Sequence, residues 1–100
     1  MTEKIYTIVW RPAAEADLQN IVDYIAQDNP IRAEEFGRSL RGKTLPLAHN
    51  PWLGHPARPG LPDYVRELVV HKHYVIFYRL LETRLVVQIL RIKHTALQMP

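Results

Sequence analysis

The chain is predicted to fold as an α+β domain in which a helical hairpin lies on one face of a mainly antiparallel sheet. Its first half carries two apolar stripes at helical spacing, separated by an Asn-Pro break. Its second half carries three consecutive runs rich in Val, Ile, Tyr and Phe, with short polar breaks between them that favour hairpins. This order of elements is that of an α+β domain, and 100 residues supply one core, so we expect residues 1–100 to form a single domain.

The N-terminal part is predicted to contain a short strand and a first helix. Residues 5–10 are mostly β-forming. Pro12 opens the helix, because proline at the first helical position removes no needed hydrogen bond. One face of this helix is apolar, and the helix is predicted to stop at residues 28–30. The apolar positions are Ala14, Leu18, Ile21, Val22 and Ile25.

A second helix is predicted to begin at Pro30, with Asn29 as its cap. Its apolar stripe consists of Ala33, Phe36, Leu40 and Leu47. Gly42 and Pro46 weaken its end, so we expect a kink or a stop near Thr44. The segment 49–63 holds four Pro and two Gly, a composition typical of an irregular connection.

Two-residue turns at 71–72 and 82–83 would set the register of the three C-terminal strands. The opposed pairs would be Leu68 with Val75, Arg66 with Phe77, Phe77 with Gln88, and Arg79 with Val86. The face toward the helices would carry Val65, Val69, Tyr74, Ile76, Tyr78, Leu85, Val87 and Ile89, with Arg91 and Lys93 at the strand end. The open face would carry Arg66, Leu68, Val75, Phe77, Arg79, Val86, Gln88, Leu90 and His94.

Charge is concentrated in the sheet half. Residues 1–57 hold six Lys/Arg and seven Asp/Glu, net −1, whereas residues 58–100 hold seven and three, net +4, and together these give +3. This favours an acidic partner. The chain has no Cys, no signal-like N-terminus and no apolar run long enough to cross a membrane, so we expect a cytoplasmic protein without a membrane partner.

Motifs for metal, nucleotide or serine chemistry are weak. His71 and His73, with His94, lack the further ligands that a zinc site requires, and the sequence predicts no metal and no cofactor. Ser39 is the only serine and lies among charged residues, and the four Gly are scattered. RNA cleavage through a 2′-hydroxyl needs only an acid, a base and cations. Arg66 and His94 are the weak catalytic candidates. For His94, a structural or solvated role is favoured over a catalytic one.

Spaced positions over nearly the whole chain resemble the RelE/ParE superfamily of toxins. They are Trp10-x3-Ala14-x2-Asp17-Leu18-x2-Ile21-x2-Tyr24-Ile25-Ala26, the Asn29-Pro30 break, Ala33, Phe36, Leu40, Pro51, Val65-Arg66-Glu67-Leu68, Tyr74-Val75-Ile76-Phe77-Tyr78-Arg79 and Ile89-Leu90-Arg91-Ile92-x-His94. The resemblance implies the toxin of a bacterial type II toxin-antitoxin pair, associated with growth inhibition and plasmid stabilization. It also implies neutralisation by a cognate antitoxin whose acidic or amphipathic segment wraps the toxin, with DNA contacted only through that antitoxin.

The superfamily contains two kinds of target. RelE-like members cleave mRNA on the ribosome, using several cations on the sheet and a Tyr in a C-terminal helix, whereas ParE-like members poison DNA gyrase. Arg66 matches one RelE cation, but Leu68, Val75 and Thr95 stand where others are expected, and the sequence stops at Pro100 before a terminal helix. The phrases Val65-Arg66-Glu67-Leu68-Val69-Val70-His71 and Ile92-x-His94-x3-Gln98-x-Pro100 look ParE-like.

The sequence therefore predicts a gyrase-directed toxin, with a ribosome-dependent mRNA endonuclease as the alternative and a relative acting only through its antitoxin as the second alternative. The predicted target-binding residues lie near the sheet and its C-terminal end, and the helices and an exposed sheet edge are expected to receive the antitoxin. Those target-binding residues are Arg66, Arg79, Arg91, Lys93 and His94.

Overall fold

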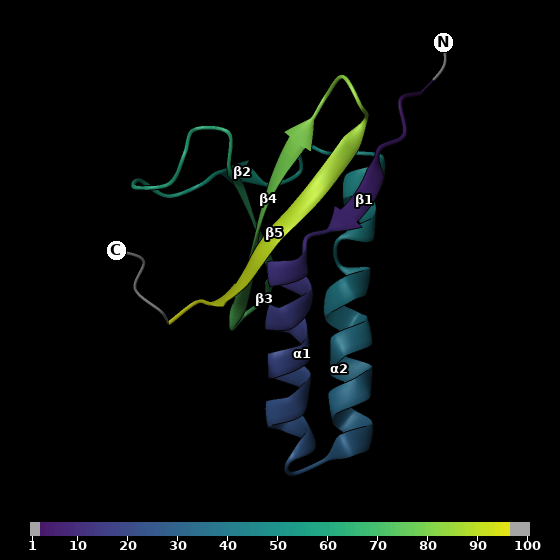
Figure 1. Ribbon diagram of the computed structural model, residues 1–100, viewed down its shortest axis with the longest axis vertical. Helices are drawn as coiled ribbons and strands as arrows, with labels where there is room; N and C mark the ends of the chain where they lie inside the picture. Colours follow the sequence, from purple (N-terminus) through teal and green to yellow (C-terminus); the bar gives the residue numbers. More distant parts are fainter. Residues whose placement is uncertain (1–2, 97–100) are drawn as a thin grey trace.

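The computed structural model, which describes residues 3–96, confirms the α+β class and the three consecutive C-terminal strands (Figure 1). A helical hairpin lies against one face of a five-stranded sheet. The elements are β1 (Thr7–Trp10), α1 (Pro12–Ala26), α2 (Pro30–Gly42), the 3-10 helix η1 (Leu45–Ala48), β2 (His55–Pro56), β3 (Arg66–His71), β4 (Tyr74–Leu81) and β5 (Val86–His94).

The strand order in the sheet is β1-β5-β4-β3-β2. β1 runs parallel to β5, and the other neighbouring strands are antiparallel. β2 lies inside the segment that was predicted to be irregular, and it pairs only with Arg66 and Glu67 at the start of β3. The remainder of β3 therefore forms a free edge, where backbone groups are open to another strand.

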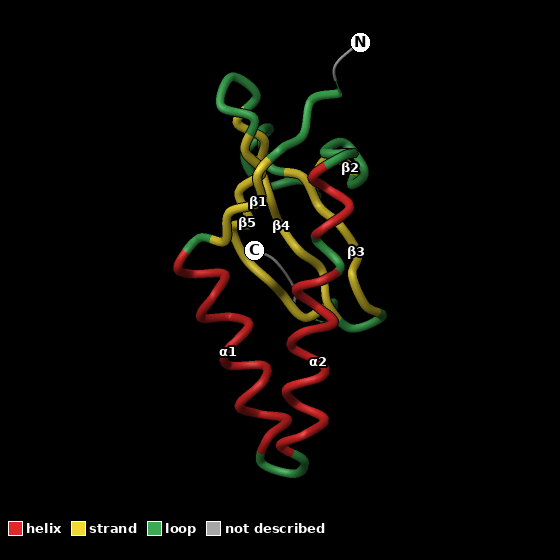
Figure 2. Tube along the Cα trace, turned by 90° about the vertical axis from the view of Figure 1, so that its right-hand side faces the viewer, coloured by secondary structure: helices red, strands yellow, loops and turns green. Residues whose placement is uncertain are grey.

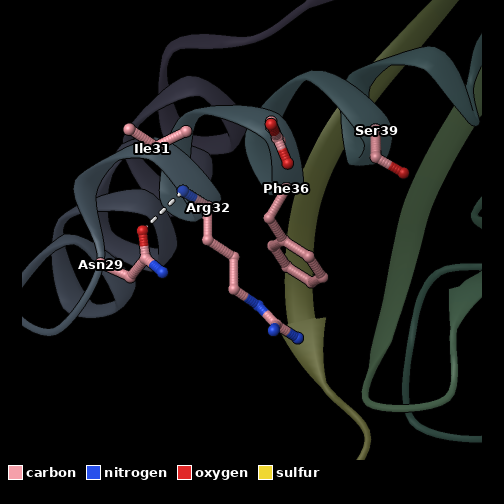
Figure 3. A pocket seen from close by; sticks show the side chains of 6 residues that line it. Asn29, Ile31, Arg32, Phe36 and Ser39 are labelled. Carbon is pink, nitrogen blue, oxygen red and sulfur yellow. Dashed lines mark hydrogen bonds between the residues drawn. The ribbon is translucent and has the colours of Figure 1, made fainter.

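Both helices begin as the sequence predicts. Pro occupies the first turn of each, and the Asn29 side-chain oxygen accepts a hydrogen bond of 3.1 Å from the backbone N–H of Arg32 (Figure 3). α2 ends at Gly42, close to the predicted stop, and the chain continues into η1, where Leu47 is buried. The apolar stripe thus continues beyond the end of α2 into the 3-10 helix η1.

The two helices lie side by side, and their connected ends extend beyond the sheet (Figures 1 and 2). Gly37 allows the close approach, because a Cβ there would stand 2.7 Å from Val22 Cγ2. Within residues 3–96 no strand covers the far end of the hairpin, and consequently Tyr24 and Ile31, which flank the connection, are 73% and 74% exposed.

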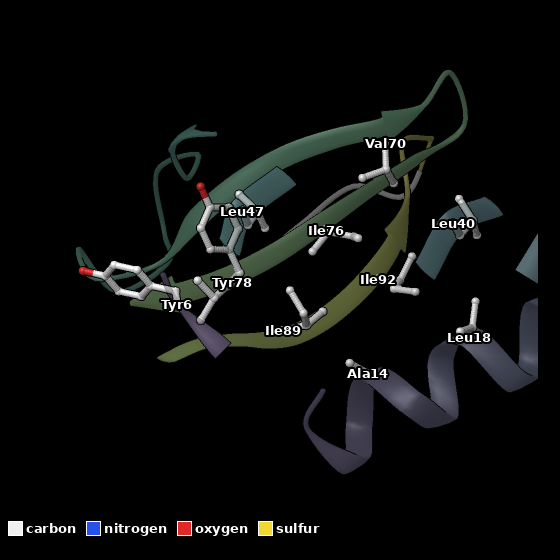
Figure 4. Packing of buried hydrophobic residues seen from close by; sticks show 11 residues of the cluster. Tyr6, Ala14, Leu18, Leu40, Leu47, Val70, Ile76, Tyr78, Ile89 and Ile92 are labelled. Carbon is white, nitrogen blue, oxygen red and sulfur yellow. The ribbon is translucent and has the colours of Figure 1, made fainter. Parts of the chain in front are cut away.

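The main core lies between the helices and the sheet (Figure 4). Tyr78 is fully buried within it, and its hydroxyl donates to the Pro51 carbonyl at 2.9 Å and accepts from the Gly54 N–H at 3.0 Å. Burial of each large side chain contributes about 1.5–3 kcal/mol. The buried members are Tyr6, Ala14, Leu18, Leu40, Leu47, Val70, Ile76, Tyr78, Val87, Ile89 and Ile92.

The predicted strand register was wrong in all four opposed pairs. Leu68 faces Ile76, Arg66 faces Tyr78, Phe77 faces Arg91, and Arg79 faces Gln88. The first turn is at 72–73 instead of 71–72, and the second connection is four residues long, 82–85. Irregularities at Val69/His71 and at Phe77/Tyr78 further shift the ladders.

In the observed register, several side chains lie on the opposite face of the sheet from the one predicted. Arg66, Leu68 and His94 share a face with Tyr78, Ile76 and Tyr74, toward the helices, because directly opposed residues point the same way. Val65 and Val69 lie on the opposite face. That face is not fully open, since Ala57 and Leu61 pack against a small cluster of Val65, Val75 and Phe77 there. The placement of Tyr74, Ile76, Tyr78, Leu85, Val87 and Ile89 toward the helices is confirmed.

Candidate functional site

The five predicted target-binding residues do not form one patch. Arg79 pairs with Gln88 near one end of β4, whereas His94 pairs with Tyr74 at the other end. Five positions of strand separate Tyr74 from Arg79, which is roughly 16 Å at about 3.3 Å per residue. Arg66 and Arg79 also begin on opposite faces of the sheet. The five residues therefore occupy separate parts of the sheet.

Arg66 is held by the loop before it. Its guanidinium donates to the backbone carbonyls of Trp52 and Gly54 and lies 4.9 Å from the Trp52 ring centroid. Its Nε atom is buried without a hydrogen-bond partner among the residues that the structure describes. These contacts fix Arg66 as an anchor of the loop, and they use the N–H groups of one terminal nitrogen of its guanidinium.

Arg79 is also engaged within the fold. Its Nε donates to Gln88 Oε1 at 2.6 Å, and its guanidinium stands 5.4 Å from the ring of Tyr64. Tyr64 is 58% exposed, so the pair lies at the surface. The hydrogen bond ties β4 to β5, and the cation–π contact ties β4 to the loop that leads into β3.

Arg91 clamps the sheet to the first helix. Its Nε and a terminal nitrogen donate to the two Asp17 oxygens at 2.7 and 2.9 Å, and the Ile92 N–H donates to the same carboxylate at 2.9 Å. Burial acts to raise the pKa of Asp17, but the Arg91 and Ile92 donors outweigh it and hold that pKa below 3.8. The bidentate geometry makes Arg91 a structural residue.

Lys93 and His94 line a cavity of about 310 Å³ between α1 and the end of β5. The His94 ring meets Tyr74 edge to face at a centroid distance of 5.3 Å. Burial, followed by the proximity of Tyr24, raises the pKa of the Tyr74 hydroxyl. Apolar and polar groups converge in this cavity, as in many binding sites. The other lining residues are Asp17, Asn20, Ile21, Tyr24, Tyr74 and Ile92.

A second hollow, of about 590 Å³, lies along the outer face of α2 (Figure 3). Ile31 and Phe36 supply its apolar part, and Arg32 and Glu35 supply one charge of each sign. The Phe36 ring meets His71 edge to face at 5.1 Å, which connects this hollow to the free edge of β3. Val69 on that edge is 60% exposed. Exposed apolar groups beside a free edge are typical of a protein-binding surface.

The face of the sheet away from the helices is partly closed by the segment 57–65. Arg58 donates to Glu67 Oε1 at 3.1 Å and to Oε2 at 2.9 Å, and Glu67 is only 6% exposed. The Arg58 hydrogen bonds outweigh burial and lower the pKa of Glu67. This ion pair holds the segment over Phe77, so the cluster beneath it is shielded from solvent.

The candidate catalytic groups lie apart in the fold. Within residues 3–96 no group of three His, Asp or Glu side chains could hold a metal ion. Arg66 and His94, the two candidates for cleavage, occupy opposite ends of the sheet and do not converge on one reacting atom.

Among the described residues, no helix is long and apolar enough to span a membrane.

Sequence reasoning missed Asp17 and Trp52 as partners of two predicted cations, Arg91 and Arg66, and it missed Arg58 as the partner of Glu67. Asp17 offered one signal, since it is an acidic residue between Ala14 and Leu18 on the apolar side of the first helix. Arg58 and Trp52 lie in the Pro-rich segment, whose path no periodicity predicts. The end of the phrase that runs from Ile92 to Pro100, with Gln98, lies outside the described residues.

Comparisons with known proteins agree with this fold. A family model described as the ParE toxin of type II toxin-antitoxin system, parDE, matches residues 8–99. The curated protein Toxin RelE2 of Caulobacter vibrioides is 39% identical over 89 residues, which cover 89% of this chain and 94% of that protein.

Two solved structures extend the likeness to three dimensions. A chain of the chromosomal ParDE system from P. aeruginosa has a TM-score of 0.76 and 26% identity, with 91% of this chain and 97% of that chain covered. A chain of the RelBE2 toxin-antitoxin complex from Mycobacterium tuberculosis has a TM-score of 0.63 and 22% identity, over 90% and 98% of the two chains. At 22% identity, the similarity to the RelBE2 chain supports the fold alone.

Proposed function

Because this chain belongs to the ParE toxin family of type II toxin-antitoxin systems, we propose that it inhibits growth by binding DNA gyrase and trapping it on cleaved DNA. The proposal makes the chain an inhibitory binding protein without covalent chemistry of its own. The observation that carries it is the engagement of Arg66, Arg79 and Arg91 by other parts of the fold. Cleavage requires preorganised donors that converge on one developing charge, whereas these arginines are directed at separate groups of the fold.

The proposed target surface is the end of the sheet that carries Lys93 and His94. There an ammonium and an imidazole border the cavity beside α1, and Arg91 holds the strand to α1 through Asp17. In this proposal Arg91 positions the surface without touching the target, and Arg66 and Arg79 hold the other end of the sheet. An acidic or polar segment of the target suits the positive charge of this half of the chain.

We also propose that a cognate antitoxin covers the α2 hollow and the free edge of β3. An amphipathic segment could place apolar side chains on Ile31 and Phe36, and its backbone could pair with β3 beyond the two residues that β2 occupies. The exposed Val69 side chain would then be buried. An acidic segment is favoured by the net charge of +3.

A second candidate function is ribosome-dependent cleavage of mRNA, and the observation in its favour is the 39% identity to a protein named Toxin RelE2. One paired assay separates the two. Purified protein is added to a gyrase supercoiling reaction that also reports cleaved DNA, and separately to ribosomes that translate a defined mRNA. The proposal expects loss of supercoiling and accumulation of cleaved DNA while the mRNA stays intact. Cuts at defined codon positions would establish the second candidate, and no effect in either arm despite antitoxin binding would indicate a relative that acts only through its antitoxin.

A further inference from the structure

Three imidazoles gather where the β3–β4 turn meets the end of β5. The rings of His73 and His94 stack at a centroid distance of 5.4 Å with an interplanar angle of 13°, and the rings of His71 and His73 are 5.5 Å apart. Tyr74 touches both His71 and His94, and Phe36 of α2 covers His71. The cluster therefore joins two strands, a turn and a helix.

Two of these rings accept hydrogen bonds from the backbone. The N–H of His73 donates to His71 Nδ1 at 3.1 Å, and the N–H of Ala96 donates to His94 Nδ1 at 3.0 Å. A backbone N–H is only a donor, so each Nδ1 atom must carry a lone pair. Both bonds are therefore possible only while the imidazoles are neutral, since a protonated ring presents a donor at each nitrogen.

The chain just after β5 is held on the turn by further contacts. The N–H of Thr95 donates to the His73 carbonyl at 2.8 Å, and the Thr95 hydroxyl donates to the Lys72 carbonyl at 3.2 Å. Together with the stacked rings, these bonds fix residues 94–96 against the turn. His94 also forms one wall of the cavity beside α1, so its position controls the shape of that cavity.

The charged surroundings disfavour additional positive charge. Lys72 belongs to the turn, Lys93 precedes His94, and on the α1 side the carboxylate of Asp17 is already bound by Arg91. Tyr24 and Tyr74 are the other titratable groups there, and on α2 Arg32 and Glu35 lie beside Phe36. Within the described residues none of the three imidazoles forms an ion pair with a carboxylate. Partial desolvation, then Lys72, His94 and His71, lower the pKa of His73.

We propose that His71, His73 and His94 form a proton-sensitive latch that holds residues 94–96 on the β3–β4 turn at neutral pH and releases them in mild acid. Protonation removes the two Nδ1 acceptors and places like charges on the stacked rings. Release of His94 then opens the cavity that Lys93 borders. Because folding lowers the pKa of His73, the contribution of this residue to stability is present above the unfolded value of 6.5 and is lost as pH falls below that value.

Amide hydrogen exchange of His73, Thr95 and Ala96, followed by NMR between pH 8 and pH 5, tests the latch. After correction for the intrinsic rate, we expect protection of these amides to fall by about fivefold or more, the effect of losing one net hydrogen bond. His71→Asn and His94→Asn are the key variants, because an Asn oxygen accepts from the same N–H and takes up no proton in this range. His71→Asn should keep the protection of the His73 amide at pH 5, and His94→Asn should keep that of the Ala96 amide. His49→Asn and His55→Asn, distant from the latch, should respond to pH as the unmodified chain does.

Two results would overturn the proposal. One is protection that stays constant from pH 8 to pH 5 in the unmodified chain. Protection that falls at the His73 amide of His71→Asn and at the Ala96 amide of His94→Asn as much as in the unmodified chain would have the same meaning. The other is the wrong tautomer at pH 8, which ring nitrogen shifts report on the unmodified chain even if a variant fails to fold. The latch requires the proton of both His71 and His94 on Nε2, and finding it on Nδ1 would contradict the hydrogen bonds on which the proposal rests.

Discussion

At the scale of single residues, the fold depends on a few positions where one extra atom or one lost charge has a large effect. Gly54 is such a position. A Cβ there would lie 2.5 Å from the Glu67 carbonyl oxygen and 2.7 Å from the Tyr78 hydroxyl. The Gly54 N–H also donates to that hydroxyl, so the loop cannot move away without losing a buried bond.

Gly54→Ala is therefore expected to lower the free energy of unfolding by about 1–3 kcal/mol, the usual cost of overpacking. Urea denaturation measures this change. Gly42→Ala is the matched control, because nothing lies within 4 Å of a Cβ at that helical position, and there the same change should stabilise by about 0.5–1 kcal/mol. Equal effects of the two substitutions would show that close packing at Gly54 is not the cause.

Asp17→Asn tests the clamp between α1 and β5. The variant keeps a hydrogen-bonding side chain but loses the charge that Arg91 and the Ile92 N–H bind, and we expect a loss of about 1–3 kcal/mol in the free energy of unfolding at pH 7. Since folding lowers the pKa of Asp17, its contribution is present above the unfolded value of 3.8 and is lost below it. The difference between variant and unmodified chain should therefore shrink as pH falls below 3.8.

Glu15→Gln is the control for that experiment. Glu15 is also on α1 and also makes two bonds to an arginine, Arg41, at 2.7 and 2.8 Å, but the pair is about half exposed. Surface pairs contribute up to about 1 kcal/mol, so this change should be the milder one. If Glu15→Gln lowered the free energy of unfolding as much as Asp17→Asn, the Asp17–Arg91 pair would contribute no more to stability than a surface pair.

At the scale of elements, the helical hairpin is set by the contact of Gly37 with Val22. Gly37→Ala places its Cβ against Val22 Cγ2 and is expected to cost about 1–3 kcal/mol, whereas the same change in a Val22→Ala background should cost less because the space is vacated. Denaturant unfolding of the four proteins in this cycle measures the coupling. Strictly additive effects would mean that the two helices do not meet there.

The helices and strands were largely predictable from local signals, but their register was not. Pro12, Asn29 and Pro30 mark helix starts through their own stereochemistry, and the structure confirms them. The β4–β5 connection carries no such mark, because Leu85 adopts the positive φ of 54° where Gly or Asn would normally be expected. The register shifts within β3 and β5 are likewise not visible in the alternation of apolar and polar residues. Each shift turns the side chains that follow it to the other face of the sheet.

At the scale of the whole molecule, the same limitation explains why the sequence did not show that the predicted target-binding residues lie apart. Composition located the positive charge in the sheet half, but it did not reveal which arginines have partners inside the fold. Those partners, Asp17 and Trp52 among them, come from segments distant in sequence. Of the five residues predicted to bind the target, Lys93 and His94 border a cavity shared with α1.

Equilibrium binding of the purified chain to DNA gyrase is the most direct test of the proposal that the Lys93–His94 end of the sheet meets the target. Lys93→Glu should weaken binding by about tenfold or more while the fold is retained, because it reverses a charge at that surface. Arg84→Glu, in the exposed turn at the opposite end of the sheet, is the matched charge reversal and should change binding by less than about twofold. Unchanged binding by the Lys93 variant, or a larger loss in the Arg84 variant, would contradict the assignment of the target surface.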